Sequence, residues 1–223
     1  NSAAIGVEFP ASKVISKPRM PMMSEATVVD TVRYFTALVL VVMFPPAFAS
    51  WFFIHPFIGF WRRVGPGLTL MIWFSAILAG FYGLFNVRGS LLAVDYGTRW
   101  MLVGLGVVLY VMGSVVEKKC RRYLTLRTLV GIPELKATDE EPGKLLNEGI
   151  YARVRHPRYL GVMLGGTGLA CIANYQATWM VMAALVPVTY LLTVIEEKEL
   201  CARFGEQYIR YEEQVPRIIP GLG

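Results

Sequence analysis

Long runs without a formal charge divide this chain into apolar segments. Four such runs, at 34–61, 64–87, 100–116 and 159–195, contain 28, 24, 17 and 37 residues. A helix needs about 20 apolar residues to cross the roughly 30 Å hydrocarbon core of a membrane. The first three runs therefore predict one membrane-spanning helix each, at about 32–54, 66–87 and 99–116.

The fourth run is long for one spanning helix and short for two. The polar triplet Asn174-Tyr175-Gln176 near its middle predicts a turn. Two arms, at about 157–173 and 177–196, would each reach only about 23 to 27 Å. We therefore expect an all-α, polytopic membrane bundle of about five transmembrane segments. Its last two segments form a helical hairpin that barely crosses the membrane.

An amphipathic pattern follows the hairpin, because Phe204, Tyr208, Tyr211 and Val215 recur at spacings of four, three and four residues. This pattern predicts a C-terminal helix that lies on the membrane surface or caps the bundle. The chain then divides into three regions. Residues 1–30 form an N-terminal surface arm, 31–116 the first three transmembrane helices, and 117–223 a cytosolic connector, the hairpin and the C-terminal helix.

Composition and charge agree with a membrane protein. The chain is 55% hydrophobic and 17% charged, with a mean hydropathy of +0.48, whereas soluble domains carry about 25% charged residues. The net charge of +6 is typical of loops facing the cytoplasm and anionic lipid, not of nucleic-acid binding. Basic residues follow the third and fifth segments, so both of these ends should be cytoplasmic: Lys118, Lys119, Arg121, Arg122, Arg127, Arg203, Arg210 and Arg217.

The same orientation places Arg62 and Arg63 inside and the N-terminus outside. The basic residues of the N-terminal region fit that placement poorly: Lys13, Lys17, Arg19 and Arg33. The three cysteines show no spacing typical of metal ligands, so we expect no metal site.

Candidate chemistry lies at the two ends of the hairpin. Arg155 and His156 directly precede Pro157, a typical first residue of a helix, and a helix N-terminus favours an anion. Glu196 and Glu197 end the second arm. Because the chain crosses and returns, the basic and acidic ends should meet on one face of the membrane.

Cations beside carboxylates suit the zwitterionic amino-acid group of S-adenosylmethionine. An arginine would hold its carboxylate, and a glutamate its ammonium or the ribose hydroxyls. Gly161, Gly165, Gly166 and Gly168 would let a ligand or a helix approach the first arm closely. Methyl transfer from a sulfonium needs alignment more than acid–base help, so a carboxylate or thiolate acceptor requires no protein base.

The C-terminal third resembles the superfamily of membrane enzymes that contains the isoprenylcysteine carboxyl methyltransferases and the phospholipid methyltransferases. The matching residues are Gly149, Tyr151, Arg155-His156-Pro157, Tyr159, Gly161, Glu196-Glu197, Leu200, Phe204-Gly205, Tyr208, Tyr211 and Val215-Pro216. The resemblance implies S-adenosylmethionine at the cytosolic end of the bundle and a lipid-facing entrance for an amphipathic acceptor. Phospholipid members also place a G-x-G against the cofactor, and Gly104-Leu105-Gly106 is similar to it.

The predicted site follows from these residues. The cofactor-binding candidates are Tyr151, Arg155, His156, Tyr159, Gly161, Glu196, Glu197, Gly104 and Gly106, and the catalytic candidates are Arg203 and Glu197. Several have structural alternatives. His156 could be an interfacial cap, Tyr151 an interfacial anchor, and Arg203 a contact for solvent or lipid headgroups. Helix packing is the favoured interpretation of Gly161-x-x-x-Gly165 and of Gly104 and Gly106.

Three functions remain open at this point. The first is an S-adenosylmethionine-dependent membrane methyltransferase that acts on a prenylcysteine carboxylate, a lipid amine or a hydrophobic thiol. The second is an NADPH-dependent membrane reductase, because sterol reductases share a related C-terminal pattern. The third is a non-catalytic lipid-binding relative. The first is favoured by Glu196-Glu197 and by the short five-segment length, with the site facing the cytoplasm of an inner membrane or of the endoplasmic reticulum.

Overall fold

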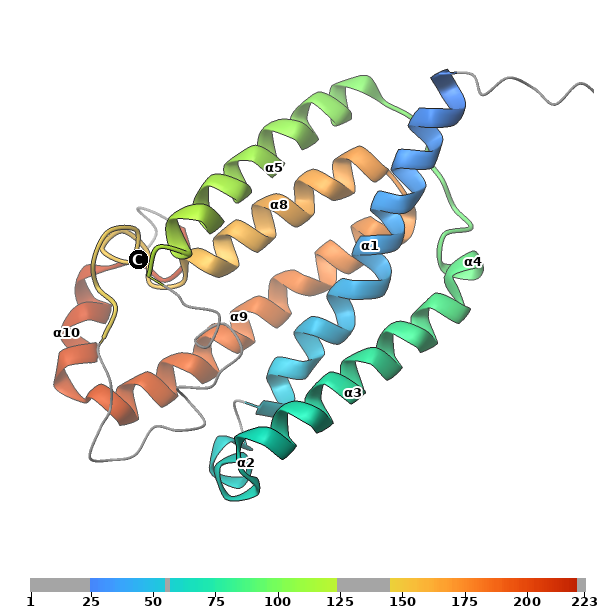
Figure 1. The fold of residues 1–223 in the computed structure, drawn as a ribbon. Coiled ribbons are helices and arrows are strands. Elements are labelled where there is room, and N and C mark those ends of the chain that lie inside the picture. Colours follow the sequence, from blue (N-terminus) through green and yellow to red (C-terminus); the bar gives the residue numbers. More distant parts are fainter. Residues whose placement is uncertain (1–24, 55–56, 124–144, 220–223) are drawn as a thin grey trace, which may run out of the picture.

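The computed structural model describes residues 25–54, 57–123 and 145–219, and within these ranges the chain is helical (Figure 1). The helices are α1 (Glu25–Ile54), α2 (Ile58–Val64), α3 (Pro66–Asn86), α4 (Arg88–Leu91), α5 (Trp100–Cys120), α8 (Pro157–Ala173), α9 (Gln176–Phe204) and α10 (Glu206–Gln214). The predicted all-α bundle is confirmed. Most of the expected N-terminal arm, and the connector at 124–144, lie outside the described residues.

Within the described residues, four helices are long and apolar enough to cross a membrane, namely α1, α3, α5 and α9. Helix α8 has 17 residues and reaches about 26 Å, so the count of five spanning segments is not confirmed. The large apolar side chains of α3 and α5 that are exposed, such as Met71 and Leu78, form a surface suited to lipid. The chain is an integral membrane protein.

Helix α9 continues eight residues past the predicted end at 196 and stops before Gly205, whose φ of 55° breaks the helix. Charged residues from Glu196 onward mark where a helix leaves the hydrocarbon, not where the helix ends. The following helix, α10, caps this end of α9. Its Tyr208 and Tyr211 are buried with Leu145 and Val215.

Helices α5 and α8 pack backbone against backbone through glycines. A Cβ atom added at Gly106 would lie 2.6 Å from the carbonyl oxygen of Gly168, and one at Gly113 would lie 2.6 Å from the amide nitrogen of Gly165. No side chain fits at such distances. This antiparallel contact fixes the start of α8 beside the end of α5.

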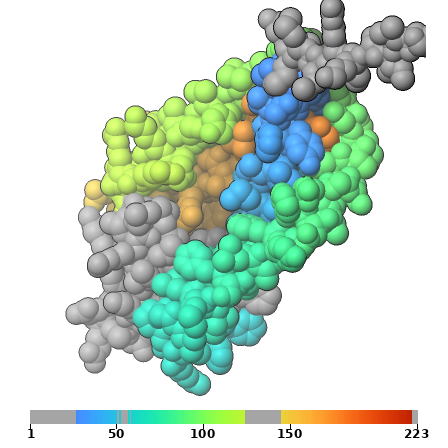
Figure 2. Space-filling view, turned by 45° about the vertical axis from the view of Figure 1, so that its right-hand side comes forward, coloured from blue at the N-terminus to red at the C-terminus, as the bar shows by residue number. Residues whose placement is uncertain are grey.

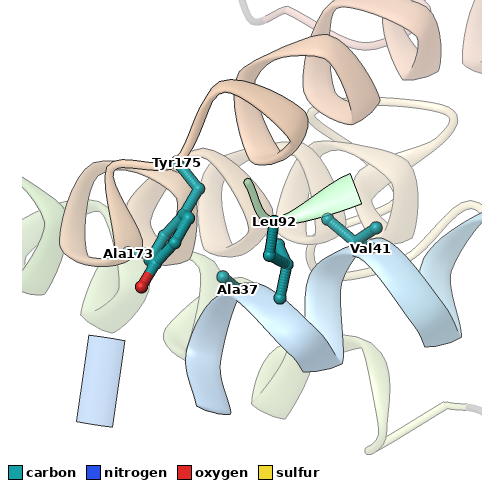
Figure 3. Close-up of a cluster of buried hydrophobic side chains, with 5 residues drawn as sticks. All are labelled: Ala37, Val41, Leu92, Ala173 and Tyr175. Carbon is teal, nitrogen blue, oxygen red and sulfur yellow. The ribbon is translucent and has the colours of Figure 1, made fainter. Parts of the chain in front are cut away.

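Helix α1 packs against α3, α8 and α9 and contributes to two apolar clusters. In the first, Ala37 and Val41 meet Leu92 and the hairpin turn at Ala173 and Tyr175 (Figure 3). In the second, deeper cluster, α1 meets both arms of the hairpin through Leu40, Ala170, Met182 and Leu185. The hairpin is therefore held from one side by α5 and from another by α1.

Polar contacts of Asn174, Asp95 and Arg33 hold the hairpin turn in place, and together they are called the polar lock below. Asn174 adopts the left-handed conformation with φ 54°, and its side-chain amide donates a hydrogen bond to the carbonyl oxygen of Gly97 at 2.8 Å. Asp95 forms an isolated β-bridge with Tyr175 and pairs with Arg33, which also contacts Asp30. Two carboxylates thus compensate the charge of buried Arg33. Lys13, Lys17 and Arg19 lie outside the described residues.

The opposite end of the bundle gathers the end of α1, all of α2, the end of α5, the start of α8, the end of α9 and α10 (Figure 1). Arg62, Arg63, Lys118, Lys119, Arg121 and Arg122 belong to these segments, together with the basic residues of the C-terminal region. The bundle therefore has one basic end, as the charge pattern indicated. Its cytoplasmic placement stays a prediction.

Candidate functional site

The basic and acidic ends of the hairpin meet in direct contact. His156 is the N-cap residue of α8, and its Nε2 lies 3.1 Å from Oε1 of Glu197 on α9. Its Nδ1 lies 3.3 Å from Oε2 of Glu196. The fold places these groups side by side because the turn at Asn174 and the glycine contact with α5 align the two arms. The predicted convergence is present.

Glu197 is the centre of this cluster. Its Oε1 also lies 2.8 Å from Nη1 of Arg155, and its Oε2 accepts a hydrogen bond from Nη2 of Arg217 at 2.5 Å. Only 6% of the Glu197 side chain is exposed. One buried carboxylate therefore binds three basic side chains, which compensates its own desolvation and theirs.

The two carboxylates dictate the charge of His156. An ionised carboxylate only accepts hydrogen bonds, so a ring with a carboxylate at each nitrogen must carry a proton on both. Burial opposes the charged ring, but the hydrogen bonds and charges of Glu196 and Glu197 outweigh it. They raise the pKa of His156 above its ordinary value of 6.5. The contacts of His156 with Glu196 and Glu197 therefore favour the protonated ring, which would donate to both carboxylates.

The C-terminal tail secures the start of α8. The amides of Arg155 and His156 donate to the carbonyls of Pro216 and Arg217 at 2.9 and 2.8 Å. Nη1 of Arg155 also donates to Glu212 of α10 at 2.7 Å. The hydroxyl of Tyr211 donates to the carbonyl oxygen of Tyr151 at 2.6 Å. The cluster is therefore assembled from three segments, namely the approach to α8, the end of α9 and the chain from α10 onward.

The outer members of the cluster are partly exposed. The exposed fraction is 19% for the Glu196 side chain, 28% for Arg217 and 37% for Glu212, against 8% for Arg155 and 6% for Glu197. The hydroxyl of Tyr159 donates to Oε1 of Glu196 at 2.5 Å and fixes its orientation. The guanidinium of Arg217 lies over the ring of Tyr190, 5.4 Å from its centroid. The accessible part of the cluster thus offers both carboxylates and a guanidinium.

The predicted cofactor candidates separate into two groups. Arg155, His156, Tyr159, Glu196 and Glu197 come together. Gly161 instead packs against Gly113 and Val116 of α5. Tyr151 is buried, with its ring edge-on to Tyr123 at 6.0 Å between centroids, and only its carbonyl joins the network.

The structure does not bring Gly104 and Gly106 to the cluster. Gly106 contacts Gly168, Cys171 and Ile172. Gly168 lies 12 residues, about 18 Å, along α8 from His156. Gly104 is exposed, with no atom near its added Cβ. The packing interpretation of Gly106 and Gly161 agrees with these contacts.

Of the two predicted catalytic residues, Glu197 and Arg203, the structure places only Glu197 in the cluster. Glu197 is the centre of the cluster. Arg203 lies seven residues beyond Glu196, about two turns farther along the same face of α9, and its guanidinium lies over Phe204 with 5.2 Å to the ring centroid.

Two members of the cluster were missing from the sequence prediction, Arg217 and Glu212. The signal for Arg217 was present, since it directly follows the matched pair Val215-Pro216. Proline fixes the backbone there, and the tail then turns back onto α8. Glu212 had no comparable signal because it is one of two adjacent glutamates on an exposed helix face.

Comparison with known proteins shows what the chain is similar to. The family model described as phospholipid methyltransferase matches residues 100–207. The chain is 28% identical over 131 residues to protein-S-isoprenylcysteine O-methyltransferase B of Arabidopsis thaliana, covering 55% of this chain and 61% of that protein. It is 30% identical over 122 residues to methanethiol S-methyltransferase of Crocosphaera subtropica, covering 52% and 46%.

Residues 100–207 are thus similar to the superfamily of phospholipid and isoprenylcysteine carboxyl methyltransferases. A further relative is the probable protein-S-isoprenylcysteine O-methyltransferase of Oryza sativa subsp. indica, 24% identical over 71% of this chain and 83% of that protein. The chain covers less than two thirds of the Arabidopsis and Crocosphaera proteins. No solved structure matches it significantly. The matched residues include most of the cluster around Glu197.

Proposed function

We propose that this protein is an S-adenosylmethionine-dependent membrane methyltransferase whose cofactor binds at the cluster around Glu197. The observation that carries the proposal is the contact between the two ends of the hairpin. Residues 41 positions apart form a buried ion cluster at one end of a membrane bundle, and Glu196 and Arg217 are presented at its surface. The similarity of residues 100–207 to membrane methyltransferases supports the same activity.

The donor set fits the polar groups of the cofactor. Glu196 retains acceptor capacity beyond its contacts with Tyr159 and His156, because a carboxylate accepts about four hydrogen bonds. It would bind the ammonium group or the ribose hydroxyls. Arg217 would bind the carboxylate. The Nε atoms of Arg155 and Arg217 are buried and lack a hydrogen-bond partner among the described residues, so donors remain for a ligand oxygen.

The residues of the cluster then have different roles. His156 and Glu197 have their polar atoms occupied within the cluster and act as positioning residues for Glu196 and Arg217. Arg155 holds Glu197 through its Nη1 and keeps its Nε for a ligand oxygen. This changes the sequence-based assignment of His156 and Glu197, which contacted the cofactor directly there. When bound, the cofactor supplies an electrophilic methyl group. The protein's contribution is alignment, which a rigid, buried ion cluster provides.

A membrane-side acceptor is supported by a cleft of about 500 Å³ between α5 and α8. Its floor is formed by Gly113, Gly161 and Gly165, and Lys118, Arg121 and Arg158 line its charged end. Such a cleft suits an amphipathic molecule with its polar group at the basic end of the bundle. The candidate acceptors remain a prenylcysteine carboxylate, a lipid amine and a hydrophobic thiol. Arg203 does not line this cleft, so its predicted contact with an anionic group of the acceptor has no support from the cleft.

The orientation is part of the proposal. Basic residues border α2, α5 and α9 at the end that carries the cluster, and such loops face the cytoplasm. The cofactor would then enter from the cytosol and the acceptor from the adjacent leaflet.

Ligand-induced stabilisation tests the cofactor. We expect S-adenosylhomocysteine, and not NADPH, to raise the melting temperature of the detergent-solubilised protein. Arg217→Ala should remove this shift, whereas Arg210→Ala should retain it, because Arg210 is exposed and pairs only with Glu206 among the contacts described. Stabilisation by NADPH alone would identify a reductase instead.

Transfer of a labelled methyl group tests the activity. The protein, supplied with labelled S-adenosylmethionine, should label a component of a lipid, prenylcysteine or small-thiol mixture, and identification of the product names the acceptor. Cofactor binding without any methyl transfer would support the alternative hypothesis that the protein is a non-catalytic relative of these enzymes.

A further inference from the structure

An apolar cavity of about 540 Å³ lies between α1 and α3. It is formed by residues before position 100, outside the family match. Its volume is within the range of about 300–1,000 Å³ that ligand sites have. Figure 2 shows α3 running beside α1 on the outer face of the molecule. The cavity shares no lining residue with the cluster around Glu197, so any ligand here is separate from the proposed cofactor.

The lining offers few groups to water. Besides the indole N–H groups of Trp61 and Trp73, it has two hydroxyl groups, and both hydroxyls are already bonded to backbone carbonyls. Ser50 donates to Ala47 at 2.6 Å, and Thr69 donates to Gly65 at 2.8 Å. Buried water needs two to four polar partners, whereas this lining is otherwise aliphatic and aromatic. A hydrocarbon chain is the matching occupant.

The cavity has the length of a lipid chain. Its wall on α3 is a stripe along one face of the helix from Thr69 to Leu84. These 16 residues cover about 22 Å of helix, more than the roughly 15 Å of one leaflet. Pro46 of α1 packs on Gly80 within this stripe and narrows the cavity along its course. An acyl chain can therefore lie along α3 over its full length.

Two positively charged arginines lie beside one end of the cavity. Trp61 of α2 lines the cavity, and Arg62 and Arg63 form the last turn of this helix. Arg63 is exposed. Tryptophan is typical of the membrane interface, and basic residues there attract anionic lipid. The apolar cavity thus begins beside two positive charges at the level of the headgroups.

We propose that the cavity between α1 and α3 binds an anionic membrane phospholipid, with one acyl chain along α3 and its headgroup at Arg62 and Arg63. The lipid is a bound component of the protein and not the methyl acceptor.

Native mass spectrometry and melting curves of the full chain in detergent test this proposal. The probes are dioleoyl phosphatidylglycerol and, as the uncharged comparison, dioleoyl phosphatidylcholine. At about ten times its dissociation constant, phosphatidylglycerol should raise the melting temperature by about 3–6 °C, with a smaller rise from phosphatidylcholine. A one-to-one lipid adduct should accompany the shift.

Four variants locate the site. Ala76→Trp fills the cavity from α3 and should abolish the adduct, and Ala49→Leu from the α1 wall should weaken it. Leu78→Trp is the matched control, because Leu78 is 63% exposed and lies on the opposite face of α3. It should bind lipid like the wild type. The double variant Arg62→Gln/Arg63→Gln should remove only the preference for phosphatidylglycerol.

Equal lipid retention by the wild type, Ala76→Trp and Ala49→Leu would show annular lipid only and overturn the proposal. Equal stabilisation by both lipids would overturn its charge selectivity. A wild-type dimer that Ala76→Trp dissociates would make the cavity a protein interface. Size-exclusion profiles like that of Leu78→Trp establish that the two cavity variants are folded.

Discussion

His156 Nε2 lies 3.1 Å from Glu197 Oε1, although the two residues are 41 positions apart. This contact joins the start of α8 to the end of α9. It is buried, and the same carboxylate also holds Arg155 and Arg217. The pair is thus the structural centre of the proposed site, and the ligand-facing groups are arranged around it.

Glu197→Gln should destabilise the protein even without ligand. Removing one partner of a buried ion pair costs about 3–5 kcal/mol, because Arg217 loses its carboxylate partner, and Arg155 and His156 are left with Glu212 and Glu196. For a chain of this size the melting temperature should fall by about 6–20 °C. Glu196→Gln is the comparison, since Glu196 is more exposed than Glu197. It should lower the melting temperature less than Glu197→Gln does but weaken binding of S-adenosylhomocysteine more directly, measured by calorimetry. Equal effects of both changes on stability would remove the distinction between positioning and ligand-facing carboxylates.

The ionised state of His156 predicts a specific dependence of stability on pH. The folded state raises the pKa of His156, so the protonated ring stabilises the fold. This stabilisation is complete below the unfolded pKa of about 6.5 and is lost as the pH rises through the higher folded pKa. The difference in melting temperature between the wild type and His156→Gln should therefore shrink from pH 6 to pH 9. Parallel curves over this range would show that His156 does not titrate.

Local signals explain how closely the hairpin could be predicted. Pro157 and the left-handed Asn174 mark both ends of α8, and the helix spans the predicted 157–173. The end of α9 lacked such a signal before Gly205, because a hydropathy change and a helix end are different events. Convergence of His156 and Glu197 followed from the chain reversal alone.

The rest of the site depends on contacts that no local pattern encodes. Arg217 reaches Glu197 because the tail forms backbone hydrogen bonds with Arg155 and His156. The sequence shows an arginine after a proline, but not where the tail goes. Similarly, a G-x-G pattern fits a ligand contact and a helix contact equally well, and only the packing of Gly106 on Gly168 distinguishes them.

The glycine contact between α5 and α8 should tolerate no side chain. In Gly113→Ala the new Cβ would lie 2.6 Å from the amide nitrogen of Gly165 and 2.7 Å from the carbonyl oxygen of Gly161. Both are backbone atoms, so the helices must separate. We expect a loss of about 1–3 kcal/mol and a fall in melting temperature of about 2–12 °C. Gly104→Ala on the same helix meets no atom within 4 Å and should not lower it. A stable Gly113→Ala protein would refute backbone contact there.

In the polar lock at the hairpin turn, Asp95 should contribute more to the stability of the fold than Asp30 does. Arg33 is 3% exposed and has two carboxylate partners, but these are not equivalent. Asp95 is 38% exposed and also accepts a hydrogen bond from the Gly97 amide at 2.8 Å, whereas Asp30 is 63% exposed. Removing Asp95 leaves a buried guanidinium with only a solvated partner and frees the loop that holds Asn174. Asp95→Ala should therefore cost about 1–3 kcal/mol and lower the melting temperature by about 2–12 °C, against less than about 2 °C for Asp30→Ala.

Because this lock sets the hairpin turn, Asp95→Ala should also weaken binding of S-adenosylhomocysteine at the other end of the two arms. Unchanged binding in a destabilised Asp95→Ala protein would show that the glycine contact alone aligns His156 with Glu197.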